Sequence, residues 1–578
     1  MLKSTKTIAI VGCGPRGLSA LENLFISLSC NLKKPTLGVL LFEKETQCGS
    51  GFIYRSNQPD ANWLNISERA LTIAKRPKIS FEAFKIESFP SYHDWTGKSK
   101  DAIINNTLEV FPKRSEIGDY LRARFASIAS VLKQNNLLNC IFEEVQTVNY
   151  NKNNLSIKTK NNTIYNADEV VLTIGHQNTK PSKQIIEWED FSTSNKKINL
   201  FKTPYPLENV LSLNFKDKEH NVGLRGFGLA MIDVARVLTE ASGGTFEITD
   251  KKTRTMKYHS EKTKLSLVPF SLDGLPMVCK PLNSKVDSFF TPSNELMLTF
   301  ESKLLQVRDN TNYNSGSDFL VEAIADVAAN QYLALGNMGY THNYSANDLN
   351  QVISKYLNNE NFEHDLILSQ NHTTEVTIKH FIDMATATQS ISLDYCLGQV
   401  WRHCEPTLYK MMSHSNLKDE VISAVIKLDE RMKRYAFGPP IESLQQLLAL
   451  ALEGTLNLNF VNDPEIKLAK KGWQLTKDEQ SITCDVMVNS VLDSAKIENV
   501  TSSIITNLLN DNIIQPVHKA LGIATQENGL VVSNNNKQIH NIAVLGRLAK
   551  GSVVGVDAIL ECFGPRIKDW ANGVIKRL

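Results

Sequence analysis

Three glycines near the N-terminus have the spacing of a phosphate-binding turn. The segment IAIVGCGPRGLSALENL places Gly12, Gly14 and Gly17 directly after an apolar run and directly before apolar positions at helical spacing. In such a turn the first glycine permits the bend, the second lets the backbone approach a pyrophosphate, and the third lets the helix pack on the sheet. The helix N-terminus then points free N–H groups at the phosphates. The spacing predicts a dinucleotide site that includes Pro15 and Arg16.

An acidic residue follows the second predicted strand. The stretch LGVLLFEKE is apolar and ends in Glu43, with Lys44 next to it. An acid at this point accepts hydrogen bonds from the hydroxyl groups of a ribose. A common strand–helix turn would explain the glycines alone. The strand, the helix, the second strand and the terminal acid together indicate a dinucleotide-binding unit.

Two later segments favour FAD as the dinucleotide in this unit. ADEVVLTIG resembles the strand and turn with which flavoproteins containing two dinucleotide-binding domains close the FAD domain, and NIAVLGRLAKGSVVGVD resembles their C-terminal segment. In many of these proteins an acid follows the first glycine of the C-terminal segment, whereas this chain has an arginine there, which leaves the partner of the ribityl chain open. The candidate FAD-binding residues from these segments are Gly175, His176, Gly546, Arg547 and Asp557.

A second glycine cluster repeats the order strand, glycines, helix, strand. NVGLRGFGLAMIDVARVLTEASGGTFEITD contains Gly223, Gly226 and Gly228, with a looser G-x-x-G-x-G spacing. The repeat predicts a second nucleotide-binding lobe, for NAD(P)H, with Gly226 and Gly228 at its turn. Two interpretations of the basic residues that follow stay open: they hold a 2′-phosphate, or they lie on a solvated hairpin, which we favour. These residues are Lys251, Lys252 and Arg254.

The elements that must position these residues fall into an α/β fold interrupted by helices. Residues 140–175 read as a strand meander, and residues 316–455 have helical periodicity and few strand signals. The fold class we expect is a two-dinucleotide-binding-domain flavoprotein with a helical insertion. The predicted parts are an N-terminal part of the FAD domain (1–200), a second lobe (201–300), the helical insertion (301–455), a return to the second lobe (456–510) and a C-terminal part of the FAD domain (511–578).

Composition argues against several other classes of protein. The 578 residues carry a formal net charge of +2, which gives no general attraction to nucleic acid or to anionic lipid. No apolar run approaches the ~20 residues that cross a bilayer. The nine cysteines form no CxxC pair, which disfavours a disulfide framework and a metal site. We therefore expect a cytoplasmic protein with a small-molecule substrate; its oligomeric state stays open.

With these segments in view, the chain resembles the FAD-NAD(P)-binding family of long bacterial flavoproteins. The resemblance extends through most of the chain; its motifs, in order, are VGCGPRGLSALENL, GSGFIY, WLNI, VLTIGH, RGFGLAMIDVARVLTEASGG, SLDGLP, RYAFGPP and GRLAKGSVVGVDAIL. It implies an FAD protein distantly similar to N-hydroxylating and Baeyer–Villiger monooxygenases. The motifs add Gly51 and Asn65 to the candidate cofactor-binding residues.

The resemblance leaves three functions to compare. The first is a monooxygenase that uses NAD(P)H and acts on a small amine or amino acid. The second is a flavin oxidase or dehydrogenase without oxygen insertion, and the third is a binding or scaffold protein stabilised by flavin. No catalytic side chain is assigned. Further candidates, each with an ordinary structural alternative, are Trp63, Arg225 and the WRHCEP segment.

Overall fold

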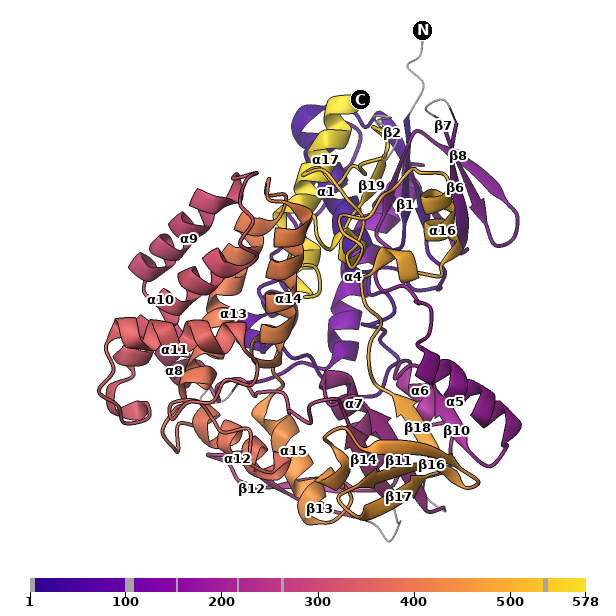
Figure 1. The fold of residues 1–578 in the computed structure, drawn as a ribbon. Helices are drawn as coiled ribbons and strands as arrows, with labels where there is room; N and C mark the ends of the chain where they lie inside the picture. Colours follow the sequence, from indigo (N-terminus) through magenta and orange to yellow (C-terminus); the bar gives the residue numbers. More distant parts are fainter. Residues whose placement is uncertain (1–5, 99–108, 152–153, 216–217, 261–264, 534–538) are drawn as a thin grey trace.

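Two parallel sheets, at opposite ends of the molecule in Figure 1, carry the two glycine turns. The computed structural model describes residues 6–98, 109–151, 154–215, 218–260, 265–533 and 539–578. The first sheet consists, in spatial order, of β19 (Ile542–Val544), β9 (Glu169–Leu172), β1 (Lys6–Val11), β2 (Leu37–Phe42) and β5 (Leu138–Ile141). All its neighbours pair in parallel. Because β19 comes from the C-terminal segment, that segment completes the N-terminal sheet.

Helices cover one face of the first sheet and a strand meander covers the other. The helices are α1 (Pro15–Asn31), α4 (Arg114–Gln134) and α17 (Pro565–Arg577). Leu18, Leu21 and Phe25 of α1 are fully buried, and each contributes about 1.5–3 kcal/mol by leaving water. The other face carries β6 (Val145–Asn151), β7 (Asn154–Thr159), β8 (Ile164–Ala167) and α16 (Ser503–Asn510).

The second sheet has the same parallel arrangement around the second glycine turn. Its order is β10 (Asn199–Phe201), β18 (Val486–Asn489), β11 (His220–Arg225) and β14 (Leu265–Phe270), and α7 (Leu229–Ala241) follows β11. Outside this sheet lie the ribbon β12 (Thr245–Asp250) and β13 (Thr255–His259), the meander β15 (Glu465–Ala469), β16 (Gly472–Lys477) and β17 (Gln480–Cys484), and α5 (Lys183–Ser194). The strand after α7, β12, therefore does not join the parallel sheet.

A group of helices is inserted between β14 and β15 and lies to the left in Figure 1. It consists of α9 (Asn294–Arg308), α10 (Asp318–Ala334), α11 (Ala346–Asn358), α12 (Thr374–Ala385), α13 (Leu393–Met412), α14 (Asp419–Ala436) and α15 (Ile441–Leu452). Its core is continuous with that of the second lobe, because Leu224 of β11 belongs to the same buried cluster as Leu320 and Phe381. Shorter elements are β3 (Ile79–Ser80), β4 (Lys85–Ile86), α2 (Tyr92–Trp95), α6 (Leu207–Val210) and α8 (Ser284–Asp287).

Three local predictions are wrong. The first long helix of the inserted group, α9, begins before residue 316, where the sequence periodicity predicts helical structure to start. The sequence favours a helix end for WRHCEP, but the segment lies inside α13, with Pro406 within the helix, and its buried residues Trp401 and Cys404 share one helix face that packs into the core. The apolar segment GLVVSN is predicted as a strand, but it is not one, since Leu530 forms only an isolated bridge to Ala543 of the short β19. Across the described residues, none of the helices is both long and apolar enough to cross a membrane.

Candidate functional site

The first glycine turn leaves bare backbone on both sides of a narrow cradle. Gly12 has a φ of 96°, and a Cβ added to Gly17 would lie 2.1 Å from the Gly12 carbonyl oxygen. Gly14 faces Gly51: a Cβ on Gly14 would lie 3.5 Å from the Gly51 Cα, and one on Gly51 would lie 2.9 Å from the Gly14 Cα. In the described chain no side chain caps α1, which begins at Pro15. The cradle fits the diphosphate of a dinucleotide.

Glu43 lies against this turn. The Cys13 amide donates to Glu43 Oε2 at 2.7 Å, and the Glu45 amide donates to Oε1 at 3.3 Å. Burial raises the pKa of Glu43, and these amides together with that of Lys44 oppose the rise. The carboxyl group therefore holds the turn in place. It lies just after β2, at the position predicted to contact a ribose. The Lys44 side chain is exposed.

The C-terminal segment returns to the same turn. The Arg16 guanidinium fills the place where a Cβ of Gly546 would stand, at 2.2 Å from Nη1, and Arg16 Nη2 donates to the Val556 carbonyl at 3.3 Å. Gly546 has a φ of 99° and Gly175 a φ of 65°. The structure therefore brings residues 16, 175 and 546 to one edge of the sheet.

His176 lies among charged side chains at this edge. Its side chain is exposed to solvent, yet partial desolvation by the neighbouring chain lowers its pKa to about 4; the positive charges of Arg547, Lys550 and Arg16 add to this, and Asp557 opposes it. The imidazole is therefore neutral at pH 7. A neutral ring beside several cations is suited to accept a hydrogen bond.

The C-terminal segment is joined to α14 by ion pairs, which we call the junction cluster. Its members are Glu430, Lys433, Arg547, Lys550 and Asp557. Asp557 Oδ2 lies 2.6 Å from Lys433 Nζ and 3.5 Å from Lys550 Nζ, and Arg547 also pairs with this carboxylate. Lys433 and Lys550 pair with Glu430 as well. These cations hold the pKa of Asp557 well below its usual range against the opposing effect of burial. Asp557 and Glu430 together offset two of the three positive charges of the cluster.

Three family-like motifs from distant parts of the chain meet next to the junction cluster. Asn65 of WLNI donates from Nδ2 to the Phe437 carbonyl of RYAFGPP at 3.1 Å. Arg434 of RYAFGPP donates from Nε to the Pro276 carbonyl of SLDGLP at 2.8 Å. Lys280, four residues further on, donates from Nζ to the Asn65 carbonyl. The FAD lobe, the second lobe and the helical insertion therefore share one junction.

Lys280 and Glu405 are the perturbed titratable groups of this junction. Burial lowers the pKa of Lys280 to about 7, and the positive charge of Arg402 adds to this effect. Burial and the charge of Asp429 raise the pKa of Glu405, whose Oε1 has no hydrogen-bond partner among the described residues. An amine with a lowered pKa beside a carboxyl group with a raised pKa is typical of sites that move protons. Glu405 belongs to the WRHCEP segment, which is a candidate from the sequence. No local pattern indicates Lys280, because its contacts depend on chain folding.

The lowered pKa of Lys280 predicts a pH dependence of stability. The unfolded lysine titrates near 10.5 and the folded one near 7, so between these values the unfolded chain binds more protons. Stability should therefore rise with pH across this window. In urea unfolding, the free energy of unfolding of Lys280→Met should rise less with pH than that of the natural protein. The exposed control Lys285→Met should show the same rise as the natural protein. An equal rise in Lys280→Met would contradict the shift.

Other sequence candidates take structural roles. Trp63 packs under the Arg236 guanidinium, 4.0 Å from its ring centre. Arg225 donates to Gln184 Oε1 and Asn489 Oδ1, both at 2.9 Å. In the WRHCEP segment, Arg402 and His403 both contact the Asp287 carboxylate.

The second glycine turn uses only two of its three glycines. Gly223 lies inside β11, where a Cβ would lie 2.6 Å from Met487 Cε. Gly226 has a φ of 107°, and Gly228 precedes α7 with nothing within 4 Å of an added Cβ. The Ser490 hydroxyl, which is buried beside Gly226, has no partner among the described residues. Open backbone and an unpaired buried hydroxyl fit a nucleotide.

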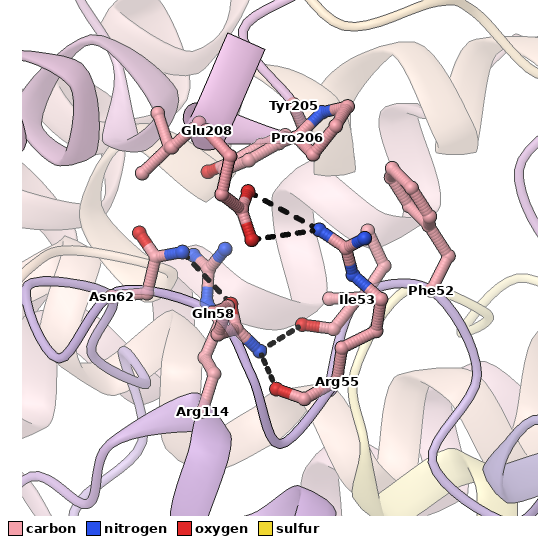
Figure 2. A pocket seen from close by; sticks show the side chains of 10 residues that line it. Phe52, Ile53, Arg55, Gln58, Asn62, Arg114, Tyr205, Pro206 and Glu208 are labelled. Carbon is pink, nitrogen blue, oxygen red and sulfur yellow. Dashed lines mark hydrogen bonds and ion pairs between the residues drawn. The ribbon is translucent and has the colours of Figure 1, made fainter. Parts of the chain in front are cut away.

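The pocket in Figure 2 lies where the two lobes meet. Its cavity volume of about 10 Å³ is far below the ~300–1,000 Å³ of typical small-molecule pockets. Arg55 points at Glu208 in Figure 2, with 3.3 Å between Nη2 and Oε2. Arg114, which also lines it, pairs with Asp233 of α7 at 2.8 Å. We interpret it as a contact between the lobes.

Comparison with known families identifies the first lobe. Residues 9–177 match the FAD-NAD(P)-binding family. Over these residues the match confirms the predicted resemblance to this family and the predicted cofactor class, FAD and NAD(P). The matched region contains part of β1 and the glycine turn. It includes the candidates Gly12, Gly14, Pro15, Arg16, Gly17, Glu43, Lys44, Gly51, Asn65, Gly175 and His176, whereas Gly226, Gly228, Gly546, Arg547 and Asp557 lie outside it.

Two relatives match about half of the chain. A nitrosuccinic acid synthase from Aspergillus oryzae is 25% identical over 286 residues, 48% of this chain and 42% of the relative. An L-aspartate N-monooxygenase (nitrosuccinate-forming) from Streptomyces cremeus is 23% identical over 339 residues, 54% of this chain and 48% of the relative. The chain therefore covers less than half the length of either relative.

Solved structures align over most of the chain at low identity. Ornithine hydroxylase from Pseudomonas aeruginosa aligns over 99% of both chains with 11% identity and a TM-score of 0.46. Cyclohexanone monooxygenase in an open form aligns over 99% of this chain and 89% of its own, with 12% identity and a TM-score of 0.41.

Proposed function

We propose that this chain is an FAD-dependent monooxygenase that uses NAD(P)H to oxygenate the nitrogen of a small amino acid. The observation that carries the proposal is the pair of glycine turns, each between parallel strands and a helix, in one chain whose lobes meet at a junction rich in cations. A carboxylate substrate is attracted to such a junction. The name of the Streptomyces cremeus relative supports an amino acid, with aspartate as the first candidate.

Each part of the chain has a distinct task in this proposal. Gly14 and Gly51 hold the diphosphate, and Glu43 holds the adenosine ribose. When bound, the flavin accepts hydride from NAD(P)H and activates oxygen. The domain boundaries given above and the cytoplasmic location belong to the proposal; the nine cysteines, all without disulfides, fit a reducing compartment.

Lys280 is the candidate proton acceptor. An amino acid carries an ammonium group near pH 7, and its nitrogen can be oxygenated only after a proton has left. The Lys280 amine, with a pKa of about 7, exists partly in the neutral form that accepts a proton at Nζ. Its hydrogen bond to the Asn65 carbonyl orients the amine toward the FAD lobe.

The test is oxygen uptake by the FAD-loaded protein with reduced nicotinamide dinucleotide and a panel of amino acids. We expect uptake that depends on one acidic amino acid, with a product one oxygen atom heavier by mass spectrometry. Lys280→Met should lower kcat by about 10²–10⁴-fold, the usual effect of a general base, while the flavin is still reduced. Uptake that yields only hydrogen peroxide with every amino acid would support an oxidase instead.

A further inference from the structure

The two lobes correspond strand by strand around their glycine turns. In the FAD lobe the Gly12 amide donates to the Phe42 carbonyl at 2.8 Å, and in the second lobe the Gly226 amide donates to the Phe270 carbonyl at 2.7 Å. Phe42 ends β2 and Phe270 ends β14, and each strand pairs in parallel with the strand that leads into its turn. The strand equivalent to β2 is therefore β14.

The correspondence extends to the helix and to the other neighbouring strand. Gly14 precedes α1 and Gly228 precedes α7, each two residues after the first glycine of its turn. The residues that follow β9 and β18, Thr173 and Ser490, each lie against that first glycine. The third glycine is replaced: the position of Gly17 corresponds to buried Met231.

This correspondence places the ribose-selecting position of the second lobe after β14. Glu43 directly follows Phe42, and Ser271 directly follows Phe270. In a dinucleotide-binding unit the residues at this strand end meet the 2′ position of the adenosine ribose, where an acid suits the hydroxyl of NAD(H) and an arginine suits the phosphate of NADP(H).

The basic residues on the β12–β13 ribbon do not occupy this place. The ribbon is a separate two-stranded sheet inserted between α7 and β14. Arg254 Nε donates to Glu442 Oε1 of α15 at 2.8 Å, and Asp250 accepts from the Lys252 amide at 2.8 Å. Of the two open interpretations, these contacts favour the hairpin, since one cation is already paired.

The residues after β14 offer an acid and no cation. Leu272 is 87% exposed, and the segment SLDGLPMV contains no lysine or arginine. Asp273 Oδ1 accepts from the Ser271 hydroxyl at 3.2 Å and from the Leu275 amide at 3.1 Å. Within the described chain, no lysine or arginine forms an ion pair with Asp273.

We infer that Ser271 and Asp273 select NADH over NADPH in this chain. The inference rests on the proposed function. The Asp273 carboxylate accepts a hydrogen bond from the free 2′-hydroxyl of NADH, and it repels the doubly charged 2′-phosphate of NADPH, for which exposed Leu272 supplies no counter-charge.

Calorimetric titration of the FAD-loaded protein with NAD⁺ and with NADP⁺ tests the inference without turnover. We expect NADP⁺ to bind about tenfold more weakly or worse, because like charges at an interface are costly. Leu272→Arg should tighten NADP⁺ binding by about tenfold and leave NAD⁺ binding unchanged. Asp273→Asn should weaken NAD⁺ binding and tighten NADP⁺ binding, so that the two affinities differ less.

Lys252→Ala is the matched control and should change neither affinity. Equal or tighter binding of NADP⁺ by the natural protein, or no response to Leu272→Arg, would overturn the inference while leaving the proposed function intact. Binding of neither dinucleotide would overturn both. Loss of NADP⁺ binding in Lys252→Ala would indicate that the β12–β13 ribbon, and not the segment after β14, contacts the 2′-phosphate.

Discussion

Gly14→Ala should give a folded protein that binds FAD much more weakly. A Cβ at residue 14 would lie 3.5 Å from the Gly51 Cα, an ordinary contact, so the protein alone accommodates it. The same Cβ points into the cradle, where the diphosphate must touch the backbone. Overpacking of about 1–3 kcal/mol corresponds to an FAD dissociation constant about 10- to 100-fold higher. Titration of the apoprotein with FAD, followed by flavin fluorescence, measures this dissociation constant.

Substitutions at two other glycines distinguish an effect on FAD binding from an effect on folding. Gly38→Ala in β2 has nothing within 4 Å of the new Cβ and should bind FAD normally. Gly17→Ala puts a Cβ 2.1 Å from the Gly12 carbonyl oxygen and should lower the melting temperature of the apoprotein itself. Unchanged FAD affinity in Gly14→Ala would show that the diphosphate does not approach this turn.

Glu22→Ala should produce the largest loss of stability. Glu22 is 2% exposed and neutralises Arg76 and Arg124, which are also buried. Arg124 donates to both carboxylate oxygens, from Nε at 2.9 Å to Oε1 and from Nη2 at 2.8 Å to Oε2. Removing the carboxylate leaves two guanidinium groups without their counter-charge, which costs about 3–5 kcal/mol. The midpoint of urea unfolding should fall accordingly.

An exposed ion pair provides the control. Glu87 pairs with Lys78 at 2.7 Å on the surface, where such pairs contribute about 0–1 kcal/mol, so Glu87→Ala should scarcely move the midpoint. Equal midpoints for the Glu22→Ala and Glu87→Ala proteins would contradict the structural role of the buried carboxylate.

The first lobe could be predicted from sequence because its signals are local. The order of strand, glycines, helix and acid lies within Ile8 to Glu43, so the whole pattern can be recognised in one short stretch of sequence. The sequence alone predicts Glu22 as a surface or locally packed residue of the helix after the turn, whereas the structure shows it as a buried counter-charge. Its partners Arg76 and Arg124 lie 54 and 102 residues away, too far for any local pattern to indicate.

The second lobe could be predicted only in outline. The glycines at 226 and 228 indicated the turn, but the strand that follows α7 in sequence is not its neighbour in the sheet. In sequence, the first strand after α7 ends at Asp250, but the strand that pairs with β11 is β14, which is followed by Ser271. Only the strand pairing shows that the proposed ribose-selecting residues follow β14. Lys280 and Glu405 likewise become neighbours through folding alone. The assignment of individual site residues to FAD stays a prediction.

An absorbance spectrum of the purified protein, recorded without air before and after addition of NADH, tests the central claim most directly. The claim is that the first lobe holds FAD and the second delivers hydride to it. We expect a yellow protein whose visible flavin band bleaches on addition of NADH. A colourless protein that takes up no added FAD, or a flavin band that neither NADH nor NADPH bleaches, would contradict the claim.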